Sequence, residues 1–209
     1  MKTREAYNIW ATQYDTNKNK TRDLEARALR QELSPIPFVN CLEIGCGTGK
    51  NTVWLIQKAA QVTAVDLSEE MLARAKEKVS VSNVTFMQAD ITAEWPFETE
   101  SFDLVSFSLV LEHIADLNFI FAQVAKVLKP GGHVYLGELH PFKQYAGTKA
   151  RFDTEAGRTE LECFTHHISE FMQAARNHQL RLLNLNEYFD ENDPTKLPRI
   201  LTLVLQKSV

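Results

Sequence analysis

The sequence predicts one α/β domain with a mostly parallel β-sheet and helices on both faces. Short apolar runs typical of buried strands alternate with amphipathic helical patterns, and a glycine-rich turn joins the first strand to the next helix. A chain of 209 residues suits one such domain with a sizeable core. In sheets of this kind, ligands bind outside the carboxyl ends of the strands.

An aromatic helix is expected at the N-terminus. Tyr7, Trp10 and Tyr14 recur at spacings of three and four, which places them on one face of a helix over residues 5–14. This helix either packs on the domain as an ordinary amphipathic element or, as part of residues 1–36, forms a lid over a site. Both interpretations stay open at this point.

A second helix is expected over residues 23–33, ended by Ser34-Pro35, because a proline disfavours helical geometry in the residue before it. The first strand follows, with Cys41, Leu42 and Ile44 as its apolar residues, and a further helix covers residues 50–59.

Three alternating glycines, Gly45, Gly47 and Gly49, separate that strand from that helix. Glycines in such a turn let the backbone approach a ligand where any Cβ would collide. The helix start beyond them adds unpaired N–H groups, which favour negative charge. The turn is therefore expected to hold a ligand against bare backbone.

Two acids close the next two strands. Asp66 ends the apolar run 61–66, about 20 residues after the glycine turn, which is the offset at which a carboxylate reaches ribose hydroxyls in a βαβ unit. Asp90 ends the run 84–90, where a carboxylate can accept a hydrogen bond from an exocyclic amine such as that of adenine. Between them, Ser68 is expected to cap a helix over 69–79.

The remaining regular elements follow the same alternation. A strand over 102–107 leads to a helix over 116–128, and Lys129-Pro-Gly-Gly132 is expected to end that helix and turn into a strand over 133–139. A helix over 168–178 and a closing antiparallel pair of strands, 181–188 and 200–206, complete the domain.

An insertion interrupts this alternation. Strand-like runs over 149–154 and 158–165 flank Glu155-Ala-Gly157, which predicts a hairpin inside the segment 141–165. This segment is the expected substrate cap.

Several motifs together carry a family resemblance. They are Glu43-Ile-Gly-Cys-Gly-Thr-Gly49, Val65-Asp-Leu-Ser68, Gln88-Ala-Asp-Ile91, Phe102-Asp-Leu-Val105 and Leu128-Lys-Pro-Gly-Gly132. Over roughly residues 38–140 the chain resembles class I S-adenosylmethionine (SAM) dependent methyltransferases of the small-molecule, type 11/12-like group. The resemblance implies a Rossmann-like seven-stranded sheet in the order 3-2-1-4-5-7-6, SAM as the cofactor and a small-molecule methyl acceptor with an O, N or C nucleophile.

The resemblance also implies a set of cofactor-binding residues. Leu67 would contact the adenine face, and the backbone near Phe107 would accept a hydrogen bond from the methionine ammonium. The full set is Tyr14, Glu43, Gly45, Cys46, Gly47, Gly49, Asp66, Leu67, Asp90, Ile91 and Phe107. Enzymes of this kind that act on base amines often carry an Asn/Asp-Pro-Pro-aromatic motif where this chain has Ser106-Phe-Ser-Leu109, which disfavours that reaction class.

Methyl transfer from a sulfonium is an in-line displacement that mainly requires alignment and exclusion of water. A general base helps only where the acceptor is protonated. The candidates are His140, His113 and Tyr14, and His140 is preferred because it ends a strand at the expected active edge. The alternative is that His140 only terminates the strand.

Two other functions are considered. A SAM-binding partner subunit without its own activity would keep the same motifs. An NAD(P)-dependent dehydrogenase is suggested by Tyr145 and Lys149, which match the Y-x-x-x-K pattern of short-chain enzymes. That pattern requires a long helix, whereas Gly147 and the preceding Pro141 indicate a loop.

Composition limits the remaining possibilities. Apolar residues make up 44% and charged residues 24%, and the net charge of −4 gives no basic footprint for nucleic acid or an anionic membrane. No apolar run approaches the roughly 18 residues of a membrane span, and the N-terminus does not resemble a signal peptide. We expect a cytoplasmic protein, as a monomer or homodimer.

Metal binding is not expected. The three cysteines, Cys41, Cys46 and Cys163, lack C-x-x-C spacing and indicate neither a zinc site nor a disulfide framework. His166 and His167 would point to opposite faces of a strand, without a third ligand nearby.

Overall fold

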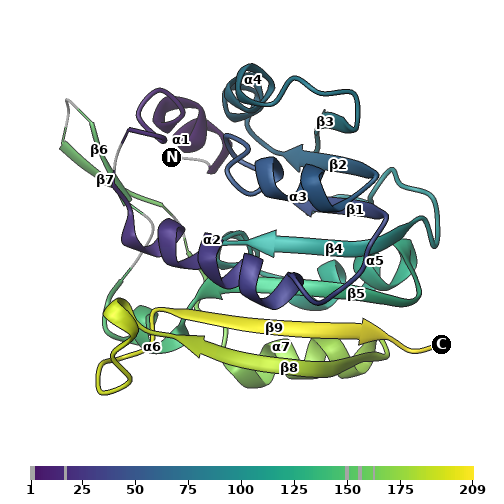
Figure 1. Ribbon diagram of the computed structural model, residues 1–209. Helices are drawn as coiled ribbons and strands as arrows, with labels where there is room; N and C mark the ends of the chain where they lie inside the picture. The colour runs from purple at the N-terminus through teal and green to yellow at the C-terminus, as the bar shows by residue number, and fades with distance from the viewer. Residues whose placement is uncertain (1–2, 17, 149–150, 155–156, 162) are drawn as a thin grey trace.

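A computed structural model describes residues 3–16, 18–148, 151–154, 157–161 and 163–209 (Figure 1). Its main sheet has seven strands in the spatial order β3-β2-β1-β4-β5-β9-β8. The strands are β1 (Asn40–Ile44), β2 (Gln61–Asp66), β3 (Val84–Gln88), β4 (Phe102–Ser108), β5 (Leu128–Leu139), β8 (Leu180–Tyr188) and β9 (Ile200–Lys207). Strands β1 to β5 run parallel, and β9 pairs antiparallel with both β5 and β8. This is the expected order 3-2-1-4-5-7-6, because β9 and β8 are the seventh and sixth strands of the sheet along the chain.

Helices cover both faces of the sheet. They are α1 (Thr3–Trp10), α2 (Lys20–Leu33), α3 (Thr52–Lys58), α4 (Glu69–Lys78), α5 (Leu117–Val127), α6 (Pro141–Tyr145) and α7 (Ile168–Asn177), with short 3-10 turns η1 (Leu111–His113) and η2 (Asp190–Asn192). In Figure 1, α2 and α3 lie in front of the sheet while α5 and α7 lie behind it. None of the described helices is long and apolar enough to cross a membrane.

The buried residues of β5 show how the strand period divides the core. Val134 and Leu136 face the cluster that includes α5 and α7, whereas Tyr135 between them faces the cluster that includes α2 and α3. Successive side chains of a strand point to opposite faces, so a central strand without charged residues at these positions is buried on both sides.

Two expected boundaries are wrong. The first helix ends at Trp10 rather than at residue 14, and turns continue to Thr16. Lys129-Pro-Gly-Gly132 does not separate helix from strand, since β5 already begins at Leu128, directly after α5. Gly131 has φ +76°, and the pairing with β4 shifts register between Phe102 and Leu104, so the Pro-Gly-Gly sequence forms an irregularity within the strand.

The inserted hairpin is confirmed as β6 (Arg151–Thr154) paired antiparallel with β7 (Gly157–Glu160). Its second strand ends five residues before the expected boundary at 165, and the turn residues 155–156 lie outside the described residues. One local expectation is also wrong: His167 is the N-cap of α7 rather than a strand residue. Residues 146–148 lie in the expected loop, directly after the short helix α6.

Candidate active site

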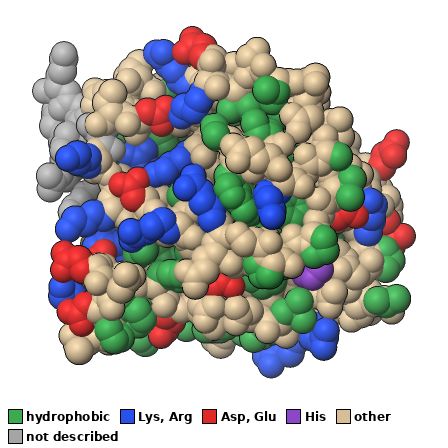
Figure 2. Space-filling model, viewed as in Figure 1, with side chains coloured by type: hydrophobic (Ala, Val, Ile, Leu, Met, Phe, Trp, Pro, Cys, Tyr) green, Lys and Arg blue, Asp and Glu red, His purple; other side chains and the backbone are tan. Residues whose placement is uncertain are grey.

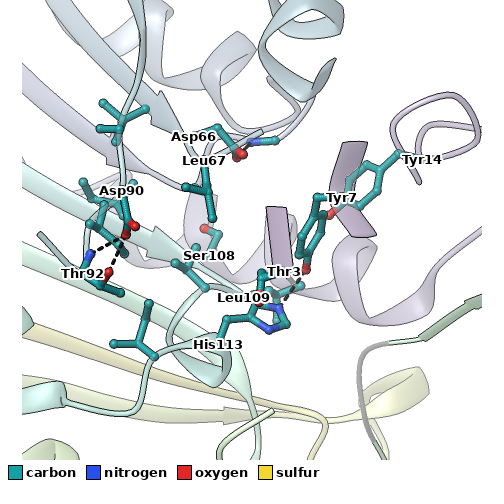
Figure 3. A pocket seen from close by; sticks show the side chains of 18 residues that line it. Thr3, Tyr7, Tyr14, Asp66, Leu67, Asp90, Thr92, Ser108, Leu109 and His113 are labelled. Atoms are coloured by element: carbon teal, nitrogen blue, oxygen red, sulfur yellow. Dashed lines mark hydrogen bonds between the residues drawn. The ribbon is translucent and has the colours of Figure 1, made fainter. Parts of the chain in front are cut away.

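A cavity lies at the carboxyl ends of β1, β2, β3 and β4, underneath α1 (Figure 3). Of the residues predicted to bind a cofactor, those that line it are Tyr14, Gly45, Gly47, Asp66, Leu67, Asp90 and Ile91. They come from the N-terminal segment, the glycine turn and the ends of β2 and β3, so the fold brings together residues up to 77 positions apart in the chain. The shared sheet edge explains this convergence.

The glycine turn forms one wall, and two of its glycines are required there by geometry. Gly45 has φ +68°, and a Cβ at this position would lie 2.2 Å from Cγ2 of Val110. Gly47 has φ +53°, and a Cβ at this position would lie 3.9 Å from Cε1 of the Tyr14 ring. Both backbones adopt a conformation that L side chains rarely take. The turn therefore presents bare backbone to the cavity.

Asp66 fixes this turn from the end of β2. One of its carboxylate oxygens accepts a hydrogen bond from the Gly47 N–H at 2.8 Å, and the other accepts one from the Ser68 N–H at 2.9 Å. Burial raises the pKa of the Asp66 carboxyl, while these backbone bonds act in the opposite direction. Each carboxylate oxygen accepts more than one hydrogen bond, so Asp66 can still receive hydroxyl groups from the cavity.

Asp90 lies just beyond β3, on the opposite side of the cavity from Tyr7 and Tyr14 (Figure 3). Its Oδ1 accepts hydrogen bonds from the Thr92 N–H at 2.9 Å and from the Thr92 hydroxyl at 2.6 Å. These bonds fix the carboxylate in place. Its Oδ2 accepts no hydrogen bond from a described residue and is available to a ligand.

The N-terminal segment covers the cavity and is held at several points. Figure 3 shows Tyr7 pointing toward His113, and the Tyr7 hydroxyl lies 2.8 Å from His113 Nε2. The Tyr7 ring stacks on Trp10, with 5.7 Å between the ring centroids. Asp15 accepts a hydrogen bond from the Thr48 hydroxyl at 2.6 Å, which ties the end of the segment to the glycine turn. Residues before α2 thus form part of the wall.

Comparisons with known proteins identify the part of the chain that carries these motifs. Residues 42–136 match the model of a methyltransferase domain family. This match covers a little less than half of the chain. An uncharacterized methyltransferase of Synechocystis sp. is 38% identical over 112 residues, which cover 53% of this chain and 51% of that protein. The ubiquinone biosynthesis O-methyltransferase of Xanthomonas oryzae pv. oryzae is 32% identical over 157 residues, which cover 68% of this chain and 62% of that protein.

The chain thus spans about half of the first relative and about three fifths of the second. Among solved structures, the DhpI–SAH complex matches with a TM-score of 0.78 at 23% identity, covering 98% of this chain and 94% of that chain. This likeness shows that the methyltransferase domain and the segments around it share that protein's fold.

The other predicted cofactor-binding residues of the methyltransferase domain do not line the cavity. Glu43 lies beneath the glycine turn, where it accepts a hydrogen bond from the Thr52 hydroxyl at 2.5 Å and burial raises its pKa to about 8. Cys46 and Phe107 are buried in the core, and Gly49 packs against α4. These residues support the turn from behind, and their direct contact with a cofactor stays a prediction.

The side chain of His140, the preferred candidate base, is held by hydrogen bonds to other residues of the protein. Its side chain is buried, Nε2 lies 2.8 Å from Glu187 Oε1, and Nδ1 accepts a hydrogen bond from the Phe142 N–H at 3.1 Å. His140 thereby caps α6, which Pro141 begins with a φ already suited to a helix. Burial lowers the pKa of His140. It does not line the cavity, and its bonds favour a capping role over the predicted role as a base.

The cavity also contains residues that the sequence did not single out. Ser108 at the end of β4 and Leu109 and Val110 in the loop after it line the cavity, and the loop after β3 supplies Thr92. The only available signal was their position after a strand that ends at the active edge. His113, considered earlier as a base of lower rank than His140, does line the cavity.

The Y-x-x-x-K pattern of short-chain dehydrogenases does not lie on a long helix in this structure. Tyr145 is the last residue of the short helix α6, and Gly147 follows with φ +87°. The Tyr145 hydroxyl lies 2.5 Å from Nδ1 of His167, outside the cavity. Lys149 lies outside the described residues.

Proposed function

We propose that this protein transfers a methyl group from SAM to a small-molecule acceptor. The observation that carries the proposal is the meeting of a glycine turn, Asp66 and Asp90 around one cavity within a methyltransferase domain. The solved DhpI–SAH complex supports the choice of cofactor. The named activity of the ubiquinone biosynthesis relative supports a small organic acceptor.

The residues present fit this cofactor. Asp66 would receive the ribose hydroxyls, because both of its oxygens are already aligned by backbone N–H groups. Asp90 and Leu67 would hold the adenine, since Oδ2 of Asp90 accepts no hydrogen bond from a described residue. Gly45 and Gly47 would lie against the methionine portion, where a Cβ would take up the space of the ligand.

The protein's own contribution is to align the reactants and exclude water. When bound, SAM supplies an activated methyl carbon, on which the acceptor's nucleophile displaces sulfur in line. Tyr7 and Tyr14 cover the cavity from α1 and the turn after it, which limits the access of water. Where the acceptor carries a proton, His113 is the candidate base that lies in the wall, with Tyr7 fixing its ring through Nε2.

The role of residues 1–36 as a lid and of 141–165 as a substrate cap belongs to this proposal. So do the predicted cytoplasmic location and the monomeric or homodimeric state. The position of Tyr7 and Tyr14 in the cavity wall supports the first of these roles.

Thermal unfolding with S-adenosylhomocysteine (SAH), SAM, NADH and NADPH, each added separately, tests the proposal. A ligand at 100 times its Kd stabilises by about 2.7 kcal/mol, or roughly 5–10 °C for a domain of this size. We expect a shift with SAH and SAM only. A shift with a nicotinamide cofactor alone would overturn the proposal and support the dehydrogenase alternative. A shift with SAH but no turnover on any acceptor would support the partner-subunit alternative.

A further inference from the structure

A second cavity adjoins the first beneath the N-terminal segment. Tyr7, Tyr14 and Leu109 line both cavities. The second cavity extends from them toward the start of α2 and toward Leu139 at the end of β5. A molecule in the second cavity would therefore lie next to a cofactor in the first, separated from it by those three shared residues. We call this second space the acceptor cavity.

The acceptor cavity carries an excess of positive charge, although the whole chain has a net charge of −4. Its basic lining residues are Lys18, Lys20, Arg22 and Arg199. Figure 2 shows Lys and Arg side chains gathered on this face of the molecule, over the beginning of α2. Glu112 is the one acid among the described lining residues.

These basic residues are not equally available. Asp190 neutralises Arg199, because both of its carboxylate oxygens accept hydrogen bonds from the guanidinium, each at 2.5 Å. Lys18 and Lys20 are exposed at the rim and form no direct salt bridge with a described residue, although the charge of Lys20 contributes to the lowered pKa of Asp190. Two exposed ammonium groups at a cavity mouth favour a ligand with a negative charge.

Arg22 adds a fixed cation deeper in the wall. Its guanidinium lies 3.9 Å from the centroid of the Tyr14 ring and 5.7 Å from that of Trp10, and it donates a hydrogen bond to the Tyr14 carbonyl at 2.5 Å. The stacking orients the guanidinium and keeps it half-buried, where its field is screened less than that of an exposed charge.

Glu112 does not cancel this charge. Its side chain is buried, which raises the pKa of its carboxyl to about 7, so the group is only partly ionised near neutral pH. Among the described lining residues, the positive balance of the cavity therefore rests on Lys18 and Lys20 at its rim.

We propose that the acceptor cavity binds the methyl acceptor and selects a small organic molecule that carries an anionic group. This inference rests on the proposed function and adds a substrate class to it. The anionic group would lie at the Lys18–Lys20–Arg22 end, and the nucleophile would lie at the Tyr7–Leu109 end, next to the methyl group. Charge-assisted hydrogen bonds to Lys and Arg are stronger than those between neutral groups, so they would discriminate against a neutral or cationic analogue of the same size.

Four monosubstituted benzenes test the charge preference by calorimetric titration into SAH-saturated protein: benzoate, phenyl phosphate, benzyl alcohol and benzylamine. We expect at least one of the two anions to bind at least tenfold more tightly than benzyl alcohol and benzylamine. Comparing the two anions shows which anionic group the cavity prefers. Equal affinities, a preference for benzylamine or no binding of either anion would each overturn the inference.

Substitution of the rim lysines provides the matched test. The double variant Lys18→Gln/Lys20→Gln should lower the affinity for the preferred anion at least tenfold and leave the affinity for SAH unchanged. The control Lys58→Gln/Lys76→Gln removes the same charge from exposed positions outside the cavity and should leave anion binding unchanged. An equal loss in both variants, or none in the first, would contradict the inference. Failure of SAH to bind the unmodified protein would instead count against the proposed function.

Discussion

The Tyr7 hydroxyl and His113 Nε2 lie 2.8 Å apart and join α1 to η1 across the cavity wall. The two residues are far apart in sequence, and both line the cavity. Their hydrogen bond is part of what holds the N-terminal segment over the site. Binding of a ligand beneath this segment should therefore depend on the hydrogen bond.

Tyr7→Phe tests this dependence. The phenyl ring keeps the stacking on Trp10, while the hydrogen bond, worth about 1 kcal/mol, is lost. We expect SAH affinity to fall about fivefold in calorimetric titration. The control is Tyr145→Phe, which removes the hydroxyl that pairs with His167 outside the cavity. Equal effects of the two variants would show that the Tyr7–His113 bond has no special role at the site.

Asp66→Ala should abolish SAH binding, because it removes both the bond that orients Gly47 and the expected ribose acceptor. Asp103→Ala is the matched control. That carboxylate also accepts two backbone hydrogen bonds, from Val39 at 3.1 Å and Asn40 at 2.7 Å, but at the amino end of β1. Both variants should lose about 1–3 kcal/mol of unfolding free energy, whereas only the first should lose SAH binding. Near-unchanged SAH affinity in Asp66→Ala would remove this residue from the site.

Gly45→Ala should destabilise the protein by about 1–3 kcal/mol in urea unfolding, because the new methyl group would overlap Val110 and φ is +68°. The double variant Gly45→Ala/Val110→Ala relieves the overlap but not the backbone strain. We expect the single variant to bind SAH more weakly than the unmodified protein, and the double variant to recover part of that affinity. Full stability and affinity in the single variant would mean that the turn rearranges freely.

The strand order and the positions of Asp66 and Asp90 could be predicted because strong local signals coincide with a global rule. Apolar runs define the strands, and parallel topology places their carboxyl ends at one edge. The loop after β4 could not be predicted in this way. Leu109 has φ +58°, a conformation usually marked by glycine, so the sequence gives no turn signal there.

The error at β5 and the absence of a signal for α6 have a similar origin. Pro-Gly-Gly normally signals a turn, yet Lys207 donates a hydrogen bond to the Leu128 carbonyl at 2.8 Å and Gln206 donates one to the Gly131 carbonyl at 3.0 Å, which hold the segment against β9. Tertiary contacts thus override the local signal. Helix α6 has five residues, too few for a hydrophobic period, and depends on its cap by His140.

Buried carboxyls should make the stability depend on pH. Burial raises the pKa of Glu43 and Glu138 to about 8, above the usual value near 4.5, so the folded state binds more protons than the unfolded state between these values. Stability should therefore fall as pH rises from about 5 to 8. Glu43→Gln should reduce this slope by up to about 1.4 kcal/mol per pH unit in urea unfolding followed across the range. An unchanged slope would mean that Glu43 is ionised in the folded protein.

His140→Gln separates the structural role of this residue from the catalytic one. The substitution disturbs the cap of α6 and the contact with Glu187, so unfolding free energy should fall by about 1–2 kcal/mol. Turnover of an identified acceptor should stay within about twofold, because His140 does not line the cavity. His113→Gln, which alters a side chain in the cavity wall, is the comparison and should lower turnover by tenfold or more. A large loss of turnover in His140→Gln at unchanged stability would instead support His140 as the base, acting in a state in which α6 moves toward the cavity.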